Sequence, residues 1–568
     1  MKKIVSTILI SMLLSLWGQR AEACSNVIVT KGASADGSCM IAYTADSHQL
    51  YGELYFHPAA KHKKGSRVAI REWDTDKPLG EIAQLPRTYQ TMGNMNERQL
   101  IIGETTWGGR EEQVDTNGII DYGSLIYITL QRASTARAAI DTIVSLANRY
   151  GYPSEGESFS IADPNEAWVM DLVGKGSGNK GIVWVARRIP DGYICAHANQ
   201  CRITRFPLND PENCLYAPDV ISYAREKGWF SGNDEDFSFR EAYNPLDFGG
   251  ARFCDSRAWS AFNILCDGQF TYEENGAERT RPASDWHEYI LGHSLNNELP
   301  LFVKPSRKLS PKDVADVMRD HFEGTPLDMT QDIGAGGNAL PYRWRPMEFT
   351  WNGKKYVNER AIATQQTGFW FVAQARGWLP DAVGALVWFG TDDSATSYLT
   401  PIYVSSEKVP ECLRAGNGDL LHYSATSQFW MCNRVANACY KMYNVMSPTV
   451  RRAIDAFEKE QMFTAIPVED AKLAALVQKG RLRKARKEMT AYSVNTAQKQ
   501  FQAWVELEEF LLVKFMDGNV KTQKEDGNFK HSKHNEGRPV LIVHPEYTKT
   551  WKQAVAESEH GSMLEAKE

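Results

Sequence analysis

Residues 24–43 of the chain read CSNVIVTKGASADGSCMIAY. The β-forming residues at 27–29 and 40–43 lie on either side of the turn residues at 35–38, which is the pattern of a β-hairpin. A strand that begins at Cys24 would fix this residue to a sheet. Because a nucleophilic side chain needs such a rigid position, the hairpin makes Cys24 the first candidate for a functional residue.

The residues before Cys24 have the three parts of a signal peptide. A positively charged start is followed by a short apolar run over 4–17 and by the small residues of Ala-Glu-Ala at 21–23. We therefore expect residues 1–23 to be removed and the protein to be exported, to the periplasm or to the extracellular space. No segment reaches about 18 uninterrupted apolar residues, so we expect no stable membrane insertion.

The composition is that of a folded globular protein. The chain has 568 residues, of which 43% are hydrophobic and 24% charged, and this mix excludes disordered and collagen-like classes. Lysine and arginine total 64 against 70 acids, so the net charge is −6, and it becomes −8 when residues 1–23 are removed. A slightly acidic chain does not produce the positive electrostatic potential that binds nucleic acid, so we expect no nucleic-acid partner.

Removal of residues 1–23 makes Cys24 the first residue, and three interpretations are open. The cysteine could be lipidated, although Ala21 and Glu22 match a bacterial lipid-attachment site poorly. It could be an N-terminal nucleophile, in which the α-amine of the same residue accepts the thiol proton. A free α-amine has a pKa of about 8 and a thiol of about 8.5, so the proton can pass between them near neutral pH. The third interpretation is a cleavage site that happens to precede a cysteine.

No residue pattern indicates a metal or another cofactor, and we expect none. The nine cysteines other than Cys24 are an odd number, so at least one stays unpaired even where export permits disulfides. Their spacing lacks the paired CxxC of a structural zinc site. His287, Glu288 and His293 do not have the spacing of a helical HExxH site.

After the hairpin, the sequence contains one segment with the hydrophobic period of a helix and several with the pattern of strands. Residues 134–150 place apolar side chains on one helical face, with Ser134 as a candidate cap and Gly151 at the end. Short strands are predicted at 100–103, 159–162, 167–172, 182–186, 193–196, 370–374 and 385–389, of which those between 159 and 196 read as an antiparallel meander. Antiparallel sheets with helices between them predict the α+β class, with helices covering the sheets.

After about residue 440 the sequence shows helical periods without the strand patterns that precede them. Pro448 predicts the start of a helix, and further helical periods follow at 469–477 and 496–516. A basic run at 479–487 is typical of a solvated helix face, because no aromatic residues interleave with it. We therefore divide the mature chain into a large unit at 24–440 and a helical C-terminal extension with a polar tail at 441–568.

Five short segments of the first 200 residues can be read together. They are CSN at 24–26, ADGS at 35–38, GETTWGG at 103–109, IADPNEAW at 161–168 and ANQ at 198–200. Taken in order, they resemble the bacterial dipeptidase family typified by dipeptidase A of lactobacilli. The resemblance implies a cysteine-type N-terminal nucleophile hydrolase, related to bile salt hydrolases and penicillin V acylase. It also implies that the unit at 24–440 is a four-layer αββα sandwich.

The resemblance implies roles for four residues. Cys24 matches the family's nucleophile, and Asp46 falls where the acylase relatives place an aspartate beside the nucleophile's amine. Asn199 resembles the asparagine whose amide helps to hold the oxyanion. Arg257 resembles a later arginine of the acylase site, which would favour the thiolate and position Asp46. Without the resemblance, Asp46 reads as a turn residue, Asn199 as a loop cap and Arg257 as part of a surface ion pair.

Two further residues are candidate substrate contacts. Thr105 falls near the place of another oxyanion contact in the acylase relatives. Glu104 is a candidate to bind the free amine of a dipeptide, although an ion pair at a strand end would equally explain it. The acylase relatives carry an arginine three residues before the aspartate, where this chain has Tyr43, and this departure leaves the activation of the thiol open.

Together these patterns predict an exported cysteine-type dipeptidase that hydrolyses small peptides through a thioester on Cys24. Two alternatives stay open. One is an N-acyl amide hydrolase of the bile salt or penicillin acylase type, and the other is a non-catalytic, lipid-anchored surface protein. The sequence also leaves open whether the chain forms a homo-oligomer.

Overall fold

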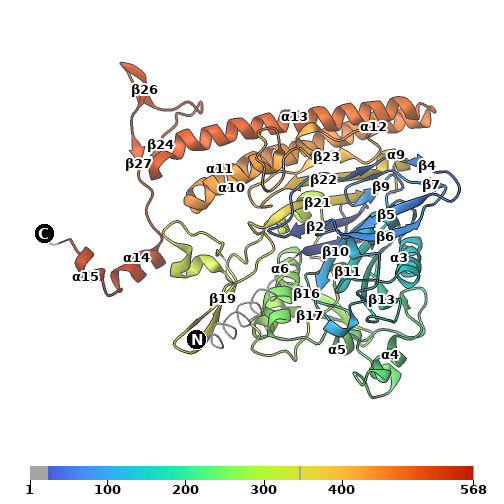
Figure 1. Cartoon of the computed structure of the whole chain (residues 1–568). Helices are drawn as coiled ribbons and strands as arrows, with labels where there is room; N and C mark the ends of the chain where they lie inside the picture. Colours follow the sequence, from blue (N-terminus) through green and yellow to red (C-terminus); the bar gives the residue numbers. More distant parts are fainter. Residues whose placement is uncertain (1–23, 345–346, 567–568) are drawn as a thin grey trace, which may run out of the picture.

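The computed structural model describes residues 24–344 and 347–566, and it mixes helices with antiparallel sheets (Figure 1). This confirms the predicted α+β class. The predicted signal peptide lies outside the described residues. Within the described ranges, no helix is both long and apolar enough to cross a membrane.

The hairpin at Cys24 forms the centre of a seven-stranded sheet. Its two strands pair antiparallel, with Ser25 opposite Thr44 and Val29 opposite Met40, as the sequence predicts. The strands of this sheet are, in spatial order, β18 (Phe302–Val303), β14 (Ile194–His197), β1 (Ser25–Val29), β2 (Cys39–Asp46), β21 (Thr367–Ala375), β22 (Ala385–Thr391) and β23 (Thr400–Tyr403).

An eight-stranded sheet lies against the first. Its strands are, in spatial order, β15 (Cys214–Tyr216), β13 (Ile182–Arg188), β12 (Ala167–Gly174), β11 (Gly156–Ala162), β10 (Ile101–Trp107), β9 (Met95–Asn96), β8 (Thr91–Met92) and β3 (Phe56–His57). The meander predicted from residue 159 is present as β11, β12 and β13. The prediction is wrong for its last member, because β14 pairs with β1 in the other sheet. Both faces of β14 are buried there.

Alternate residues of the central strands enter two separate cores. Ile28 and Ile41 belong to a cluster that includes residues of both sheets, whereas Val27 and Val29 belong to a second cluster shared with the helices α6 (Ser256–Leu265) and α8 (Pro311–Val317). On the far side, α3 (Ala136–Tyr150) contacts β11, β12 and β13, and α2 (Tyr122–Leu130) contacts α3 and β10. Cys24 lies in the first cluster.

The helix predicted at 134–150 is α3, with a different cap. Thr135 rather than Ser134 caps it, because the Thr135 hydroxyl accepts a hydrogen bond from the backbone N–H of Ala138. Gly151 ends the helix, as predicted, with φ at +78°, a conformation that glycine adopts without strain.

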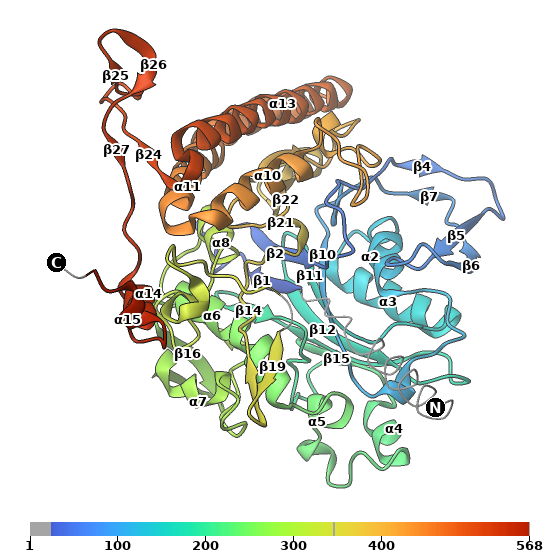
Figure 2. The same ribbon diagram turned by 60° about the vertical axis from the view of Figure 1, so that its left-hand side comes forward.

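The C-terminal helices lie against the outer strands of the seven-stranded sheet (Figure 2). They are α10 (Gln428–Lys441), α11 (Tyr443–Glu460), α12 (Ile466–Gln478) and α13 (Leu482–Phe515). Pro448 lies inside α11 rather than at its start, since the helix begins at Tyr443 and Met446 is already buried on the N-terminal side of the proline. The division of the chain at 440/441 stays a prediction, and it falls one residue before the end of α10.

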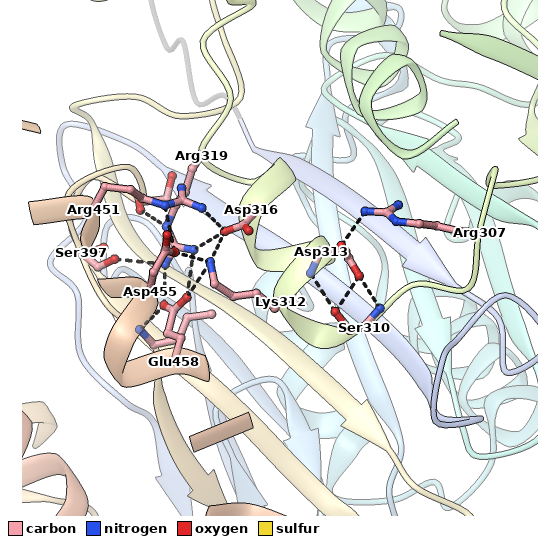
Figure 3. A network of polar contacts seen from close by, with 12 residues as sticks. Arg307, Ser310, Lys312, Asp313, Asp316, Arg319, Ser397, Arg451, Asp455 and Glu458 are labelled. Carbon is pink, nitrogen blue, oxygen red and sulfur yellow. Dashed lines mark hydrogen bonds and ion pairs between the residues drawn. The ribbon is translucent and has the colours of Figure 1, made fainter. Parts of the chain in front are cut away.

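A buried ionic network joins α8 to α11 (Figure 3). Glu458 of α11 receives the Arg319 guanidinium at 2.6 Å, and Lys312 of α8 lies 2.8 Å from Asp455 and 3.5 Å from Glu458. The Glu458 side chain is fully buried and the Arg319 side chain is 2% exposed. The network therefore holds the first C-terminal helices against the helices that cover the sheet.

Smaller elements surround the sheets. They are the helices α4 (Val220–Glu226), α5 (Phe239–Tyr243), α7 (His287–Ile290), α9 (Asp381–Gly384), α14 (Lys549–Ala556) and α15 (Gly561–Leu564), and the paired strands β4 (Ala60–Lys61) with β7 (Arg87–Thr88), β5 (Arg67–Arg71) with β6 (Pro78–Ala83), β16 (Gln269–Glu274) with β17 (Ala277–Pro282), β19 (Glu348–Trp351) with β20 (Lys354–Val357), β24 (Val520–Lys521) with β27 (Ile542–Val543), and β25 (His531–Ser532) with β26 (Asn535–Pro539).

Candidate active site

Cys24 immediately precedes β1 and lies on the wall of a cavity of about 80 Å³. Its residue surface is 7% exposed. The Sγ atom is 3.6 Å from Oε1 of Glu104 and 3.7 Å from the hydroxyl of Tyr43, and the Tyr43 hydroxyl donates a hydrogen bond to the same Glu104 oxygen. Side chains of β2 and β10 therefore both contact the sulfur atom of the residue that precedes β1.

The thiol of Cys24 is held in its protonated form. Burial raises the pKa of Cys24 well above its usual range, and the charges of Glu104 and Asp46 raise it further. Hydrogen bonds from the Asp46 backbone and from Tyr43 lower this pKa, but by less.

His197 is not available as a base, because its ring nitrogens lie 2.7 Å from Thr105 Oγ1 and 2.6 Å from Ser160 Oγ. Burial lowers the pKa of His197 to about 3. Attack by this thiol therefore needs another proton acceptor.

Asp46 is a buried strand residue rather than a turn residue. Its Oδ2 atom accepts hydrogen bonds from Arg360 at 2.6 Å and from the Thr44 hydroxyl at 2.9 Å, and its Oδ1 accepts one from the Thr367 hydroxyl at 2.6 Å. Arg360 was not predicted as a site residue. It lies 314 positions from Asp46, outside every recognised motif, and no sequence signal marks it.

Arg257 and Asn199 form a unit with the backbone of Cys24. Arg257 donates hydrogen bonds to the Cys24 carbonyl at 2.6 Å, to the Ser25 hydroxyl at 2.9 Å and to the Asn199 side-chain oxygen at 2.9 Å. With 2% of its surface exposed, Arg257 is not part of a surface ion pair. The guanidinium bonded to Asp46 belongs to Arg360, so Arg257 acts on Cys24 and Asn199 instead.

The Asn199 amide is oriented by its two neighbours. Its Nδ2 donates to the carbonyl of Thr106 at 2.6 Å while its oxygen accepts from Arg257. The backbone of Asn199 has φ at +53°, the left-handed region that asparagine tolerates better than most residues. The asparagine side chain is therefore fixed beside Arg257 and the backbone of β10, but it does not line the cavity.

Glu104 and Thr105 leave β10 on opposite faces, because neighbouring side chains alternate along a strand. Thr105 bonds to His197 and is not part of the cavity wall. Glu104 lines the cavity, is 2% exposed and also hydrogen-bonds the carboxyl of Glu157. Burial raises the pKa of Glu104, and the hydrogen bonds that it makes with Glu157, Tyr43 and Cys24 oppose this shift.

The cavity wall also includes residues that sequence analysis missed. Trp73 and Asp74 come from the tip of the β5–β6 hairpin, and Tyr122 comes from the start of α2. With Asp46 and Glu104, Asp74 makes three acids on the wall, and none of the described lining residues is lysine or arginine. Such a cavity favours a cationic group. Across the described part of the chain, no group of histidines, cysteines and acids is arranged to hold a metal ion.

Comparison with known proteins places this chain in a family of peptidases. A family model described as peptidase family C69 matches residues 23–456, which is most of the chain. The match includes every candidate site residue, from Cys24 to Arg360. It confirms the resemblance to the bacterial dipeptidases.

Individual relatives have low sequence identity to this chain, but the aligned regions cover most of both proteins. A probable dipeptidase of Salmonella dublin is 25% identical over 67% of this chain and 81% of its own length. A probable dipeptidase of Latilactobacillus sakei is 23% identical over 69% of this chain and 76% of its own length. Dipeptidase A of Lactobacillus helveticus is 22% identical over 77% of this chain and 85% of its own length.

Proposed function

Because the chain belongs to peptidase family C69, we propose that it is a cysteine-type dipeptidase, exported and active after removal of residues 1–23. The names of the relatives support hydrolysis of dipeptides. The observation that carries the proposal is the cavity in which the Cys24 sulfur lies beside acidic side chains. A small acidic cavity suits a small substrate with a free amine.

In the proposed reaction, the Cys24 α-amine accepts the thiol proton and the sulfur attacks the peptide carbonyl. A bond forms between sulfur and carbon, the peptide C–N bond breaks, and the amine passes its proton to the leaving amino acid. The acyl part stays on Cys24 as a thioester. Water then hydrolyses the thioester, which releases the second product and restores the thiol.

The surrounding residues have separate proposed roles. Asp46, fixed by Arg360, orients the Cys24 amine, and Arg257 holds the Cys24 carbonyl and the Asn199 side chain. In this proposal the Asn199 amide turns from the Thr106 carbonyl towards the oxyanion and stabilises it, a contact whose loss typically costs about 3–4 kcal/mol. Two facing sheets with helices on their outer sides support assignment of residues 24–440 to the four-layer sandwich of N-terminal nucleophile hydrolases.

Substrate comparison tests the function. The processed enzyme is offered free dipeptides, the same dipeptides with an acetylated amine, and uncharged acyl amides. We expect turnover of the free dipeptides alone. Preference for the acyl amides would replace the dipeptidase by an N-acyl amide hydrolase. An intact mass that shows a diacylglycerol group on Cys24 would contradict catalysis by this residue altogether.

A further inference from the structure

A second cavity lies between β13 of the eight-stranded sheet and β18, the edge strand of the seven-stranded sheet. We name it the edge cavity; its volume is about 560 Å³, and the β16–β17 hairpin and residues 296–301 complete its wall. Tyr193, which precedes β14, also lies on this wall. Because Ile194 of β14 is opposite Val29 of β1, the edge cavity lies at the other end of β1 from Cys24.

One arginine on the wall of the edge cavity has neither a hydrogen bond nor an ion pair with the described residues. Arg187 of β13 lies between Val169 and Cys214 on the neighbouring strands, so its cross-strand neighbours offer no carboxylate. Its Nε atom is buried, and no described atom accepts a hydrogen bond from it. The adjacent Arg188, by contrast, reaches Glu166 at 3.1 Å.

The unpaired guanidinium costs free energy. Burial lowers the pKa of Arg187, because the charged form loses hydration. Electrostatic attraction to Cys214, Asp210 and Glu273 opposes this shift but does not cancel it. The Phe302 ring, 5.8 Å from the guanidinium, adds a cation–π contact. A bound anion would therefore supply the partner that the described protein does not.

The two other arginines of the edge cavity have partners of their own. Arg281 donates a hydrogen bond to Asp285 at 2.9 Å, and Arg205 lies 3.4 Å from Asp236. Both of these pairs are exposed to solvent. Arg187 is therefore the group on this wall that is best placed to bind an anion.

Three acids on the same wall limit the charge of the ligand. Glu274 and Glu298 pair with arginines outside the edge cavity, at 3.7 and 2.5 Å, whereas Glu273 is exposed on β16. Repulsion from these acids disfavours phosphate and other multiply charged anions. A single carboxylate is favoured instead, because it can accept two parallel hydrogen bonds from one guanidinium.

The remainder of the wall suits an apolar group. Phe302, Tyr193 and Tyr272 contribute aromatic rings, and residues 299–301 read Leu-Pro-Leu. The volume falls within the range of about 300–1,000 Å³ that sites for small molecules occupy. A ligand of this site would thus combine one carboxylate with an apolar body.

We infer that the edge cavity binds a small monocarboxylate through the Arg187 guanidinium and packs the apolar body of this ligand against Phe302. The site is separate from Cys24 and its cavity. The inference does not depend on the proposed function, because no step of the proposed reaction involves these residues.

Calorimetric titration of the full-length protein, without residues 1–23, tests the inference. The probe is 3-phenylpropionate, and 3-phenylpropanol and inorganic phosphate are its uncharged and multiply charged counterparts. We expect one 3-phenylpropionate per chain and an affinity at least about tenfold lower for the other two, since a charge-assisted contact is lost or repulsion is added. This comparison uses the wild type alone, so it does not depend on the folding of any variant.

Variants of β13 then locate the site. Arg187→Gln should lower the affinity for 3-phenylpropionate by about tenfold or more, and Arg187→Lys should lower it less. Arg188→Gln is the matched control on the opposite face of β13 and should bind as the wild type does. Without ligand, Arg187→Gln should keep the wild-type melting temperature, because no described partner is lost.

Four results would overturn the inference. They are no binding of 3-phenylpropionate by the wild type, equal binding of 3-phenylpropanol, tighter binding of phosphate, and unchanged affinity in Arg187→Gln. A large fall in the melting temperature of Arg187→Gln would also contradict it, since Arg187 would then stabilise the fold rather than bind a ligand.

Discussion

At the scale of single residues, the chemistry depends on one buried thiol whose surroundings oppose its ionisation. Burial and the neighbouring Glu104 and Asp46 raise the pKa of Cys24. A base adjacent to the sulfur is therefore required, and release of the α-amine by removal of residues 1–23 would supply it. In the proposed function, removal of residues 1–23 would therefore be an activation step as well as a step of export.

Cys24→Ser should abolish turnover without unfolding the protein. Serine keeps the geometry, but its hydroxyl is a much poorer source of nucleophile, so kcat should fall by about 10³-fold or more. Turnover and circular dichroism are measured together. Cys214→Ser, a change at a buried thiol of β15 outside the cavity, is the control and should keep its activity. Wild-type turnover in Cys24→Ser would place the nucleophile elsewhere.

Arg360→Gln should impair catalysis through Asp46. Loss of the guanidinium leaves the buried Asp46 carboxylate without its cationic partner, so Asp46 should orient the Cys24 amine less well and kcat should fall. Arg360→Lys keeps the positive charge and should restore part of kcat, while thermal unfolding reports whether each variant keeps its fold. Equal losses of kcat in Arg360→Gln and Arg360→Lys would contradict this role.

Sequence reasoning found part of the site in two ways. A strand pattern with a turn located Cys24 on its hairpin, whereas Asp46, Asn199 and Arg257 were predicted only through the resemblance to the dipeptidase family. Arg360 and Asp74 were missed because nothing in their own segments distinguishes them. They reach the site through tertiary packing, by the pairing of β2 with β21 and by the fold of a surface hairpin.

At the scale of elements, the hydrophobic periodicity of the sequence located most strands and helices. It did not identify the strands with which each strand pairs or the surfaces on which the helices pack. The pattern at 193–196 has the length of a strand, yet only the open edge of β1 decides that it joins the seven-stranded sheet. Likewise, Pro448 is typical of a helix start, but α11 already begins at Tyr443 and buries Met446 before the proline. Local propensity gives way to packing at both places.

Glu458→Gln should destabilise the protein by loosening α11 from α8. The substitution removes the fully buried carboxylate partner of Arg319 and leaves only the partly exposed Asp316 at 3.2 Å, and removing one member of a buried pair typically costs about 3–5 kcal/mol. The free energy of unfolding in urea is the measurement. Glu411→Gln breaks an exposed pair with Arg414, so it should cost less than about 1 kcal/mol. Equal effects of the two substitutions would mean that the network contributes little.

At the scale of the whole molecule, a buried acid beside α10 makes stability depend on pH. Asp392 follows β22 and accepts a hydrogen bond from Asn433 of α10 at 2.9 Å. Burial raises the pKa of Asp392 to about 8. In the unfolded chain an aspartate titrates near about 3.9, so the folded state alone keeps the proton between these values. The contribution of Asp392 to stability is therefore complete below about pH 4 and is lost as the pH rises through about 8.

Asp392→Asn should remove this dependence. Asparagine cannot ionise, and it tolerates the backbone φ of +63° at this position. Relative to the wild type, the variant should gain unfolding free energy as the pH is raised from about 5 to about 8. Unfolding in urea at the two pH values measures the difference. A difference that does not change with pH would show that Asp392 does not titrate in this range.

The central claim is that Cys24 acts as nucleophile only when its own amine is free. The most direct test is one fusion protein, with a cleavable partner joined to Cys24, assayed on a free dipeptide before and after a protease releases the partner. We predict no turnover before cleavage and full turnover afterwards, with no gain in the same fusion that carries Cys24→Ser. Equal turnover before and after cleavage would contradict the account.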